Sequence, residues 1–326
     1  MSMNSGASVT GSSSATNSSL ENTAPVKGMV LIRGGAFVMG STDFYPEERP
    51  QRPAEVPDLW MDEHPVTNAQ FRRFVRETGH ITVAEQAPNP EDFPGADPAD
   101  LVPGSQLFAG TSGPVPLDDW MRWWAWAPGA DWRHPQGPDS TLHGRELHPV
   151  VHIGFEDALA YAQWVGKDLP SEAEWEFAAR GGMDQATYAW GNEFMPGGKI
   201  MANTWHGNFP YQNDSAPGQD RTTPVKRYPP NGYGLYDVAG NVWEWTRSPW
   251  TPDHSERQPG SPPEAAHSCC APATSAVLTE TDQRVTKGGS HLCAPSYCHR
   301  YRPAARQGHT VRSTTSHLGF RCYRPA

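Results

Sequence analysis

The chain has 326 residues, 37% of them hydrophobic, which is enough to bury the core of one large domain or of two ordinary ones. Its formal net charge of −10 argues against a nucleic-acid-binding surface and is compatible with bound cations. No run of 18 apolar residues occurs, which argues against a transmembrane helix, so we expect neither a nucleic-acid nor a membrane partner.

The first 25 residues are rich in Ser, Thr, Asn and Gly and lack the basic start and apolar stretch of a signal peptide. We therefore expect residues 1–25 to form a disordered tail. The chain has five cysteines, an odd number, which without an export signal predicts a cytoplasmic protein with functional thiols rather than a framework of disulfides. The 31 glycines and 33 prolines predict a backbone that is ordered but irregular.

Four segments of the first half carry clear secondary-structure signals. Residues 29–40 are predicted to form two short strands about a glycine turn. Residues 67–79 and 171–182 each begin with a capping box and end at a glycine, which predicts a helix in both. A further helix is predicted over residues 155–165, closing at Gly166.

In the second half, aromatic residues stand among glycines and prolines, and brief strands are predicted near residues 284–287 and 319–323. Residues 250–283, rich in Pro, Ser and Ala, are predicted to form a long surface loop. Segment 148–152 resembles a buried strand. Its two histidines are therefore expected to be hydrogen-bonded, rather than to form a metal cluster with His143.

Cys293 and Cys298 lie five positions apart in the glycine-led segment 288–302. In an extended strand they would lie ~16 Å apart, and on a helix ~140° apart around the axis, so neither conformation brings the sulfurs together. Residues 294–296, Ala-Pro-Ser, can turn the chain. The two sulfurs would then converge on each other, as a structural or redox disulfide, or on one metal ion.

The other three cysteines carry less information. Cys269 and Cys270 fall in the predicted loop, where they are either exposed thiols or a reactive, copper-delivering pair. Cys322 lies in an apolar segment and is predicted to be an inert buried thiol.

The order of several motifs resembles that of the formylglycine-generating enzymes. The segments that carry this resemblance are 29–40, 66–71, 132–135, 137–140, 148–152, 169–176, 231–235, 240–245, 288–302 and 318–322. A cysteine pair between Ser290 and Arg302 is typical of the active branch of the family. The resemblance implies a single mixed α/β domain over residues 26–326, with low regular secondary structure and a distant relationship to C-type lectins.

The resemblance also implies a reaction. A cysteine in a Cys-x-Pro-x-Arg segment of an unfolded or nascent type I sulfatase would be oxidised to Cα-formylglycine, with O₂, copper and a thiol reductant. Cu(I) is soft and prefers thiolates. By resemblance Cys293 and Cys298 would hold it, while Trp243, Ser290 and Tyr297 would line the pocket for oxygen and the substrate thiol.

Calcium sites are implied as well. Ca²⁺ accepts carboxylate and carbonyl oxygens in irregular geometry. The matching positions of the first site are Asp237, Gly240, Val242 and Glu244. A solvated acidic turn is the alternative. A second site would use Asn203 and the carbonyl of Thr204, but its acidic partner falls at Pro217, so Asp214 or Asp220 would have to substitute.

The chain also departs from the family where the substrate arginine would bind. The acidic positions expected there correspond to Pro65 and to the altered segment 85–108. Glu85, Glu91 and Asp92 are candidate replacement carboxylates.

Two other functions share this fold. Catalytically silent binding modules would be expected to lack the cysteine pair. Sulfoxide synthases, which are non-haem iron enzymes, take iron-binding histidines from an added helical domain, and the ~35 residues before the predicted fold are too few for one.

Overall fold

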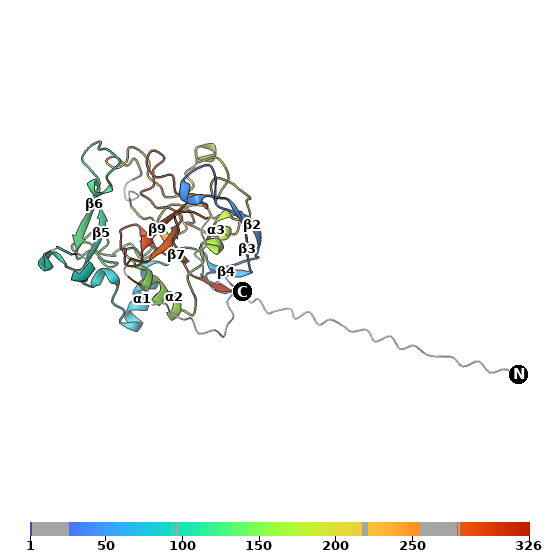
Figure 1. Ribbon diagram of the computed structural model, residues 1–326, viewed down its shortest axis with the longest axis horizontal. Coiled ribbons are helices and arrows are strands. Elements are labelled where there is room, and N and C mark those ends of the chain that lie inside the picture. Colours follow the sequence, from blue (N-terminus) through green and yellow to red (C-terminus); the bar gives the residue numbers. More distant parts are fainter. Residues whose placement is uncertain (2–25, 93, 96, 217–220, 255–278, 280) are drawn as a thin grey trace.

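Figure 1 shows the computed structural model, which describes Met1 and residues 26–326 except 93, 96, 217–220, 255–278 and 280. The predicted tail, apart from Met1, and most of the predicted loop over 250–283 lie outside these described residues. So do Cys269 and Cys270. No helix in the described part is long and apolar enough to cross a membrane.

Two sheets form the centre of the fold. One is antiparallel and has the order β1 (Met29–Ile32), β4 (Leu59–Asp62), β11 (Tyr323–Pro325). The other has the order β10 (Leu318–Gly319), β7 (Trp243–Pro249), β8 (Gln283–Lys287), β9 (Arg306–Thr310); β10 and β7 run parallel and the remaining pairs antiparallel. Strands from the beginning and the end of the fold therefore share one sheet.

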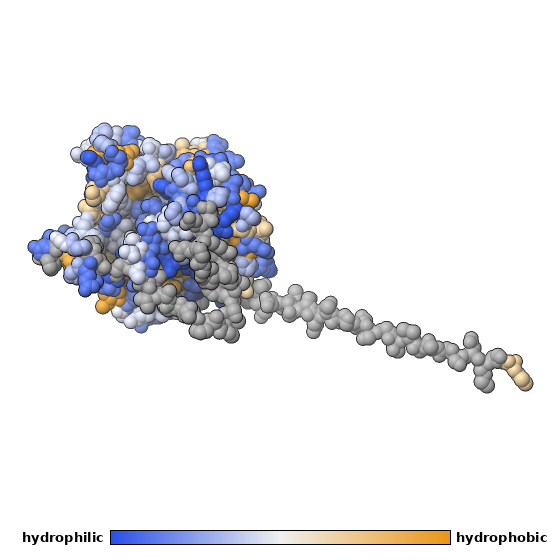
Figure 2. Space-filling view, viewed as in Figure 1, coloured by the Kyte–Doolittle hydropathy of each residue, from blue (hydrophilic) through white to orange (hydrophobic). Residues whose placement is uncertain are grey.

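Two antiparallel ribbons flank these sheets. They are β2 (Gly35–Met39) with β3 (Arg52–Val56), and β5 (Gly104–Phe108) with β6 (Trp124–Pro128). In the view of Figure 1 they lie on opposite sides of the molecule, with β7 and β9 between them. The face in Figure 2 is mainly hydrophilic, with apolar residues in small separate groups.

The α-helices confirm the predictions from the capping signals. They are α1 (Asn68–Thr78), α2 (Phe155–Trp164) and α3 (Glu172–Arg180). In α1 the Thr67 hydroxyl accepts from the Gln70 amide, and Gly79 ends the helix in the left-handed region. Short 3₁₀ turns connect other parts of the chain: η1 (Pro46–Glu48), η2 (Val83–Glu85), η3 (Pro90–Asp92), η4 (Pro98–Asp100), η5 (Trp120–Arg122) and η6 (Pro196–Gly198).

The largest apolar cluster joins α1, α2 and β7 to residues 288–302, called the cysteine segment below. Phe71 of α1 stacks on Tyr161 of α2, with ring centroids 5.9 Å apart. Trp243 of β7, Cys293 and Cys298 belong to the same buried cluster. Burying one large apolar side chain contributes about 1.5–3 kcal/mol, so this core fixes the position of the two thiols.

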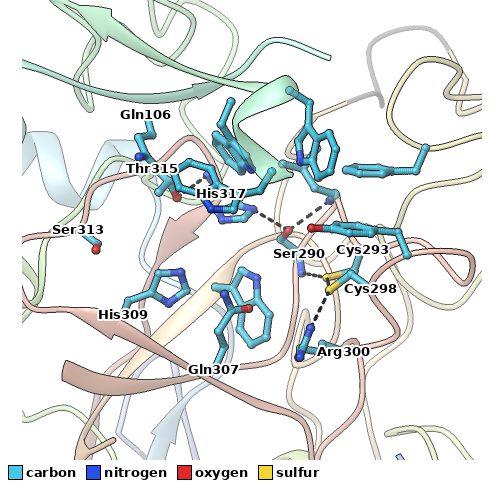
Figure 3. A pocket seen from close by; sticks show the side chains of 17 residues that line it. Gln106, Ser290, Cys293, Cys298, Arg300, Gln307, His309, Ser313, Thr315 and His317 are labelled. Carbon is cyan, nitrogen blue, oxygen red and sulfur yellow. Dashed lines mark hydrogen bonds between the residues drawn. The ribbon is translucent and has the colours of Figure 1, made fainter. Parts of the chain in front are cut away.

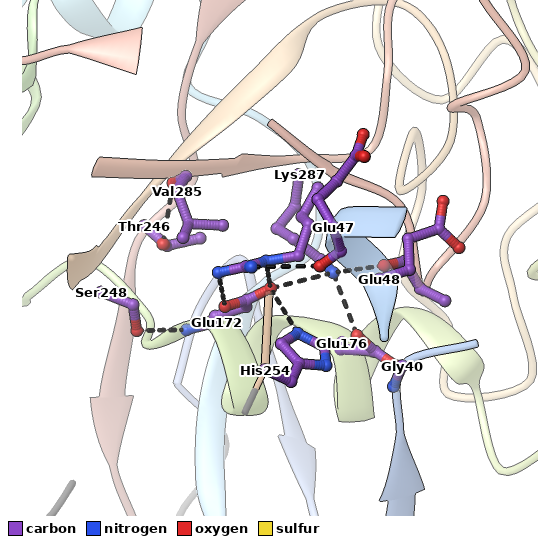
Figure 4. A network of polar contacts seen from close by, with 12 residues as sticks. Gly40, Glu47, Glu48, Glu172, Glu176, Thr246, Ser248, His254, Val285 and Lys287 are labelled. Atoms are coloured by element: carbon purple, nitrogen blue, oxygen red, sulfur yellow. Dashed lines mark hydrogen bonds and ion pairs between the residues drawn. The ribbon is translucent and has the colours of Figure 1, made fainter. Parts of the chain in front are cut away.

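Helix α3 is buried along its whole length although it carries charged residues (Figure 4). Glu172 accepts from Arg306 at 2.7 Å. Glu176 accepts from Lys287 at 3.0 Å and from Arg180 at 2.7 Å. Because a buried charge is tolerated only with a partner, these ion pairs fix α3 against β8 and β9.

Two strand predictions need correction. Brief strands lie at both ends of residues 319–323, as β10 and β11, but they are separated where the carbonyls of Phe320 and Cys322 accept hydrogen bonds from Val66 and Asp62. Segment 148–152 forms no regular strand: it has a single bridge, between Pro149 and Thr67. The strands near residues 29–40 and 284–287 are confirmed by β1, β2 and β8.

Candidate functional site

A cavity of about 300 Å³ opens where η5, β5, β6, β7, β9 and the cysteine segment meet (Figure 3). It is lined by Gln106, Trp120, Trp123, Trp124, Phe209, Trp243, Ser290, Leu292, Cys293, Tyr297, Cys298, Arg300, Gln307, His309, Ser313, Thr315 and His317. The five positions predicted from the resemblance all lie in this wall. Ser290 and Cys293 are 0% and 2% exposed, which places them at the inner end.

The predicted turn brings the two sulfurs together. The amides of Tyr297 and Cys298 donate to the carbonyl of Ala294, at 3.1 and 2.8 Å, and so close the turn. The Sγ atoms of Cys293 and Cys298 are 3.1 Å apart. A disulfide bond is about 2.05 Å long, so the pair consists of two free thiols in hydrogen-bond contact.

Gly289 makes this compact segment possible. Its φ is +68°, and a Cβ there would lie 2.8 Å from the carbonyl oxygen of Arg300 and 2.9 Å from the amide nitrogen of Tyr301. Any side chain would therefore push apart the two arms of the cysteine segment, and only glycine adopts this conformation without strain.

The two thiols differ in acidity. The Cys293 S–H donates to Cys298, and with the nearby Arg300 guanidinium this lowers the pKa of Cys298 to about 7, although burial acts in the other direction. Burial raises the pKa of Cys293 well above its usual range, and the neighbouring Cys298 adds to this effect. Cys298 is thus the thiol that ionises first.

The turn η1 holds the C-terminal part of the cysteine segment in place. Arg300 donates to Glu47 at 2.6 Å and lies 4.0 Å from the sulfur of Cys298. Two residues on, the buried Arg302 donates to Glu48 at 2.9 Å and stacks over the Phe44 ring. Both guanidinium groups are therefore held by carboxylates from the beginning of the fold.

Aromatic rings form the other wall of the cavity. Tyr297 is stacked on Phe209 at 4.6 Å and meets the edge of Trp123 at 5.3 Å. Trp243 is 1% exposed, whereas Trp120 is 49% exposed, so the cavity runs from an open rim at Trp120 to a closed end at Trp243 and the thiols.

Ser290 and His317 are hydrogen-bonded at the closed end. The Ser290 Oγ lies 3.1 Å from the Nδ1 of His317 and accepts from the Leu292 amide at 3.2 Å. The Ser290 amide donates to the Cys293 sulfur at 3.4 Å. Sequence reasoning missed His317, although it directly precedes the motif at 318–322.

The first calcium site is only partly matched by the side chains. Burial raises the pKa of Asp237 to about 6, as expected for a carboxylate whose charge is not fully balanced. Glu244, however, accepts from Arg321 at 2.6 and 2.8 Å and from Trp175 at 2.7 Å. Arg321 already supplies positive charge there, so a calcium ion would have to share the Glu244 carboxylate with Arg321.

The second calcium site falls partly in the undescribed region, because Pro217 and Asp220 lie there. Asn203 and Thr204 are buried next to Gly240, which bridges to Asn203. Asp214 accepts from Gln212 at 2.9 Å. In the described part of the chain, no three His, Cys, Asp or Glu side chains group as metal ligands. Both calcium sites stay predictions.

The histidines of the predicted segment 148–152 and Cys322 have the contacts of structural residues. His148 is hydrogen-bonded to Thr222 at 3.0 Å, and His152 to Ser105 at 2.7 Å. His143 is exposed. These contacts agree with the predicted hydrogen-bonded histidines. Burial raises the pKa of Cys322 well above its usual range, which keeps this thiol inert.

Neither Glu85 nor Glu91, two of the candidate carboxylates for a substrate arginine, is among the residues that line the cavity. Glu85 accepts from Thr82 and pairs with Arg133. Glu91 is exposed on η3, and the side chain of Asp92 lies outside the described part. Among the described residues that line the cavity there is no carboxylate.

Comparison with known proteins places the chain in a family. It matches the sulfatase-modifying factor enzyme 1-like domain over residues 14–326. It is 55% identical over 295 residues to a formylglycine-generating enzyme of Mycobacterium tuberculosis, which covers 90% of this chain and 96% of that relative. The enzyme of the same name from Thermomonospora curvata is 44% identical over 301 residues, with 91% and 93% covered.

The fold is shared with solved structures as well. PvdO from Pseudomonas aeruginosa matches with a TM-score of 0.61 and 22% sequence identity, covering 91% of this chain and 94% of that chain. This likeness, with the small separate sheets and few helices, confirms the predicted mixed α/β fold of low regular content. Because the match extends over nearly its whole length, the chain belongs to the sulfatase-modifying factor family, the family of the formylglycine-generating enzymes.

Proposed function

We propose that this protein oxidises the cysteine of a Cys-x-Pro-x-Arg segment in a type I sulfatase to Cα-formylglycine, with O₂ as oxidant and Cu(I) held by Cys293 and Cys298. The observation that carries the proposal is the pair of free thiols, 3.1 Å apart, at the inner end of the cavity. Relatives named formylglycine-generating enzyme, 55% and 44% identical, support the same reaction.

The donor set fits a soft metal ion. Two sulfurs, one of them with a pKa of about 7, offer thiolate ligands near neutral pH, and thiolates favour Cu(I) over hard cations. Bound there, Cu(I) would supply the electron transfer to O₂ that side chains alone do not provide. The Arg300 guanidinium, 4.0 Å from the Cys298 sulfur, would balance the negative charge of the ligands.

The balance of the reaction explains the reductant. Converting R–CH₂–SH to R–CHO and H₂S takes two electrons from the substrate, whereas reducing O₂ to water takes four. Two molecules of a thiol reductant supply the other two electrons and become a disulfide. The sum is one substrate thiol, one O₂ and two reductant thiols giving aldehyde, H₂S, disulfide and one water.

The size of the cavity suits an unfolded substrate. A volume of about 300 Å³ accommodates a cysteine side chain and its nearest neighbours, but no folded domain. The substrate would therefore be an unfolded or nascent sulfatase polypeptide whose flanking residues lie over the rim at Trp120. A cytoplasmic location fits such a partner and the thiol reductant. In addition, we propose Ca²⁺ near Asp237 as a structural ion.

The experiment that tests this proposal is a peptide assay. A Cys-x-Pro-x-Arg peptide is incubated with the copper-loaded protein in air with a thiol reductant, and its mass is measured. We expect loss of one H₂S and gain of one oxygen, with no change for the Cys298→Ala variant or for a peptide with serine in place of cysteine. The absence of aldehyde from any such peptide would reject the proposal, and bound iron instead of copper would favour a sulfoxide synthase.

A further inference from the structure

His317 joins two parts of the active-site wall (Figure 3). Its Nδ1 lies 3.1 Å from the hydroxyl of Ser290, and its carbonyl accepts from the Trp243 amide at 2.8 Å. Its ring meets the Trp124 ring at 4.8 Å. The parallel pairing of β10 with β7 places His317 there, because β10 begins at the next residue. The imidazole is therefore fixed directly behind Ser290.

Counting donors and acceptors shows what the Ser290 hydroxyl presents to the cavity. A hydroxyl has one hydrogen and two lone pairs. The Leu292 amide occupies one lone pair. When Nδ1 of His317 carries no hydrogen, it accepts the serine hydrogen, and the second lone pair faces the cavity. When Nδ1 carries the hydrogen, both lone pairs are filled and the hydroxyl hydrogen points into the cavity instead.

The surroundings of His317 keep its ring neutral. Burial lowers its pKa well below the usual range, and His291, His309 and His152 around it act in the same direction. Each of these three histidines bonds elsewhere: to the Asn241 carbonyl, to Thr286 and to Ser105. The Nδ1 of His317 is hydrogen-bonded to the Ser290 hydroxyl, and a neutral imidazole has one nitrogen free to accept a hydrogen.

We propose that His317 positions Ser290 as a hydrogen-bond acceptor for the substrate thiol. The inference rests on the proposed function. The substrate S–H donates to Ser290 Oγ while the serine hydrogen is held by His317 Nδ1, so that the neutral pair orients the thiol. No proton or electron is transferred in this arrangement. A neutral imidazole suits the role, because burial disfavours its charged form.

The first test needs neither copper nor substrate. In the metal-free, ¹⁵N-labelled protein at neutral pH, we expect the Nδ1 of His317 to be unprotonated and to accept a hydrogen bond. Its ¹⁵N resonance should move in Ser290→Ala, whereas that of His309, which bonds to Thr286, should not. A hydrogen on Nδ1 in the wild type would overturn the proposal, because Ser290 could then not accept from a thiol.

The second test is a double-mutant cycle on peptide oxidation. We expect Ser290→Ala and His317→Leu each to lower kcat/KM by about 100-fold with KM little changed, and the double variant to be no worse than the poorer single one. His317→Asn, whose amide oxygen can accept the serine hydrogen, should recover most of the activity. The control pairs Ser290→Ala with His309→Leu, where the losses should multiply.

The outcomes separate the two proposals. Multiplying losses in the His317 cycle, or an unchanged kcat/KM in His317→Leu, overturn the positioning role of His317, while a wild-type protein that makes aldehyde still supports the proposed function. A wild-type protein that makes no aldehyde overturns the proposed function, and the positioning role with it. If His317→Leu does not fold, His317→Asn decides: activity lost as in Ser290→Ala, at an unchanged melting temperature, contradicts the inference.

Discussion

Lys287 offers a quantitative test of how the active-site sheet is held against α3. Its ammonium group is completely buried and donates to Glu176 at 3.0 Å and to the Ala304 carbonyl at 3.3 Å, with Glu172 at 3.6 Å. Lys287→Met keeps most of the length of the side chain and removes the charge. Two buried carboxylates then lose one of their cations.

The size of the effect follows from the partners that remain. Removing one member of a buried ion pair costs about 3–5 kcal/mol, because the other charge is left buried and unpaired. Here Glu176 keeps Arg180 and the Gly40 amide, and Glu172 keeps Arg306, so we expect the lower end of this range, about 3 kcal/mol. At about 2 °C per kcal/mol for a chain of this size, the melting temperature should fall by ~6 °C.

The measurement compares thermal melting and urea midpoints of the wild type and two lysine variants. Lys226→Met is the matched control, because Lys226 pairs with Glu63 at the surface and its side chain is 41% exposed. Such a pair contributes less than about 1 kcal/mol, so this variant should melt within ~2 °C of the wild type. Lys287→Met with Glu176→Gln should recover part of the loss, because glutamine carries no charge.

Two results would refute this reasoning. One is a Lys287→Met protein that melts within ~2 °C of the wild type, since the buried charges would then contribute no more than an exposed pair. The other is a double variant that loses the full sum of the two single losses, since the two residues would then not interact.

Three further predictions concern the metal ions and pH. Cys293→Ala and Cys298→Ala should each lose Cu(I) in competition with a chromophoric chelator, whereas Cys322→Ala should keep it; copper retained by Cys298→Ala would contradict the site. Chelation should lower the melting temperature of the wild type but not of Asp237→Asn, and identical melting with and without chelator would exclude a structural ion there. Arg306, His254 and Lys287 outweigh burial and depress the pKa of Glu172, so its contribution to stability is complete above the unfolded value of about 4.3 and is lost as pH falls below it. Melting temperatures recorded from neutral pH downwards should therefore drop in acid. A melting temperature that does not change with pH would show that the pKa of Glu172 is not depressed.

Features set by neighbours along the chain were the ones that sequence reasoning found. The caps of α1 and α3 each depend on two side chains three positions apart, and both were predicted. The turn at Ala294 depends on Pro295 and its neighbours. It brings the two sulfur atoms to 3.1 Å, as the predicted turn requires. In each case the hydrogen bonds that stabilise the element close within a few residues.

Features set by distant contacts were missed. Ser290 and His317 are 27 positions apart, and Glu244 and Arg321 are 77 apart. No local pattern indicates that Glu244, a predicted calcium ligand, also pairs with Arg321. The strand β9 was not predicted because its residues, with Gln307 and His309 facing the cavity, are polar and follow no apolar alternation.

The ion pair between η1 and the cysteine segment has a consequence for when the site can form during synthesis. Glu47 and Arg300 are separated by 253 positions, so Glu47 leaves the ribosome long before its partner exists. Both thiols also emerge before His317 does. The proposed catalytic centre therefore cannot assemble until His317 has left the ribosome as well. On the proposed function, the enzyme must finish its own folding first, and it must then meet its substrate before that chain has folded.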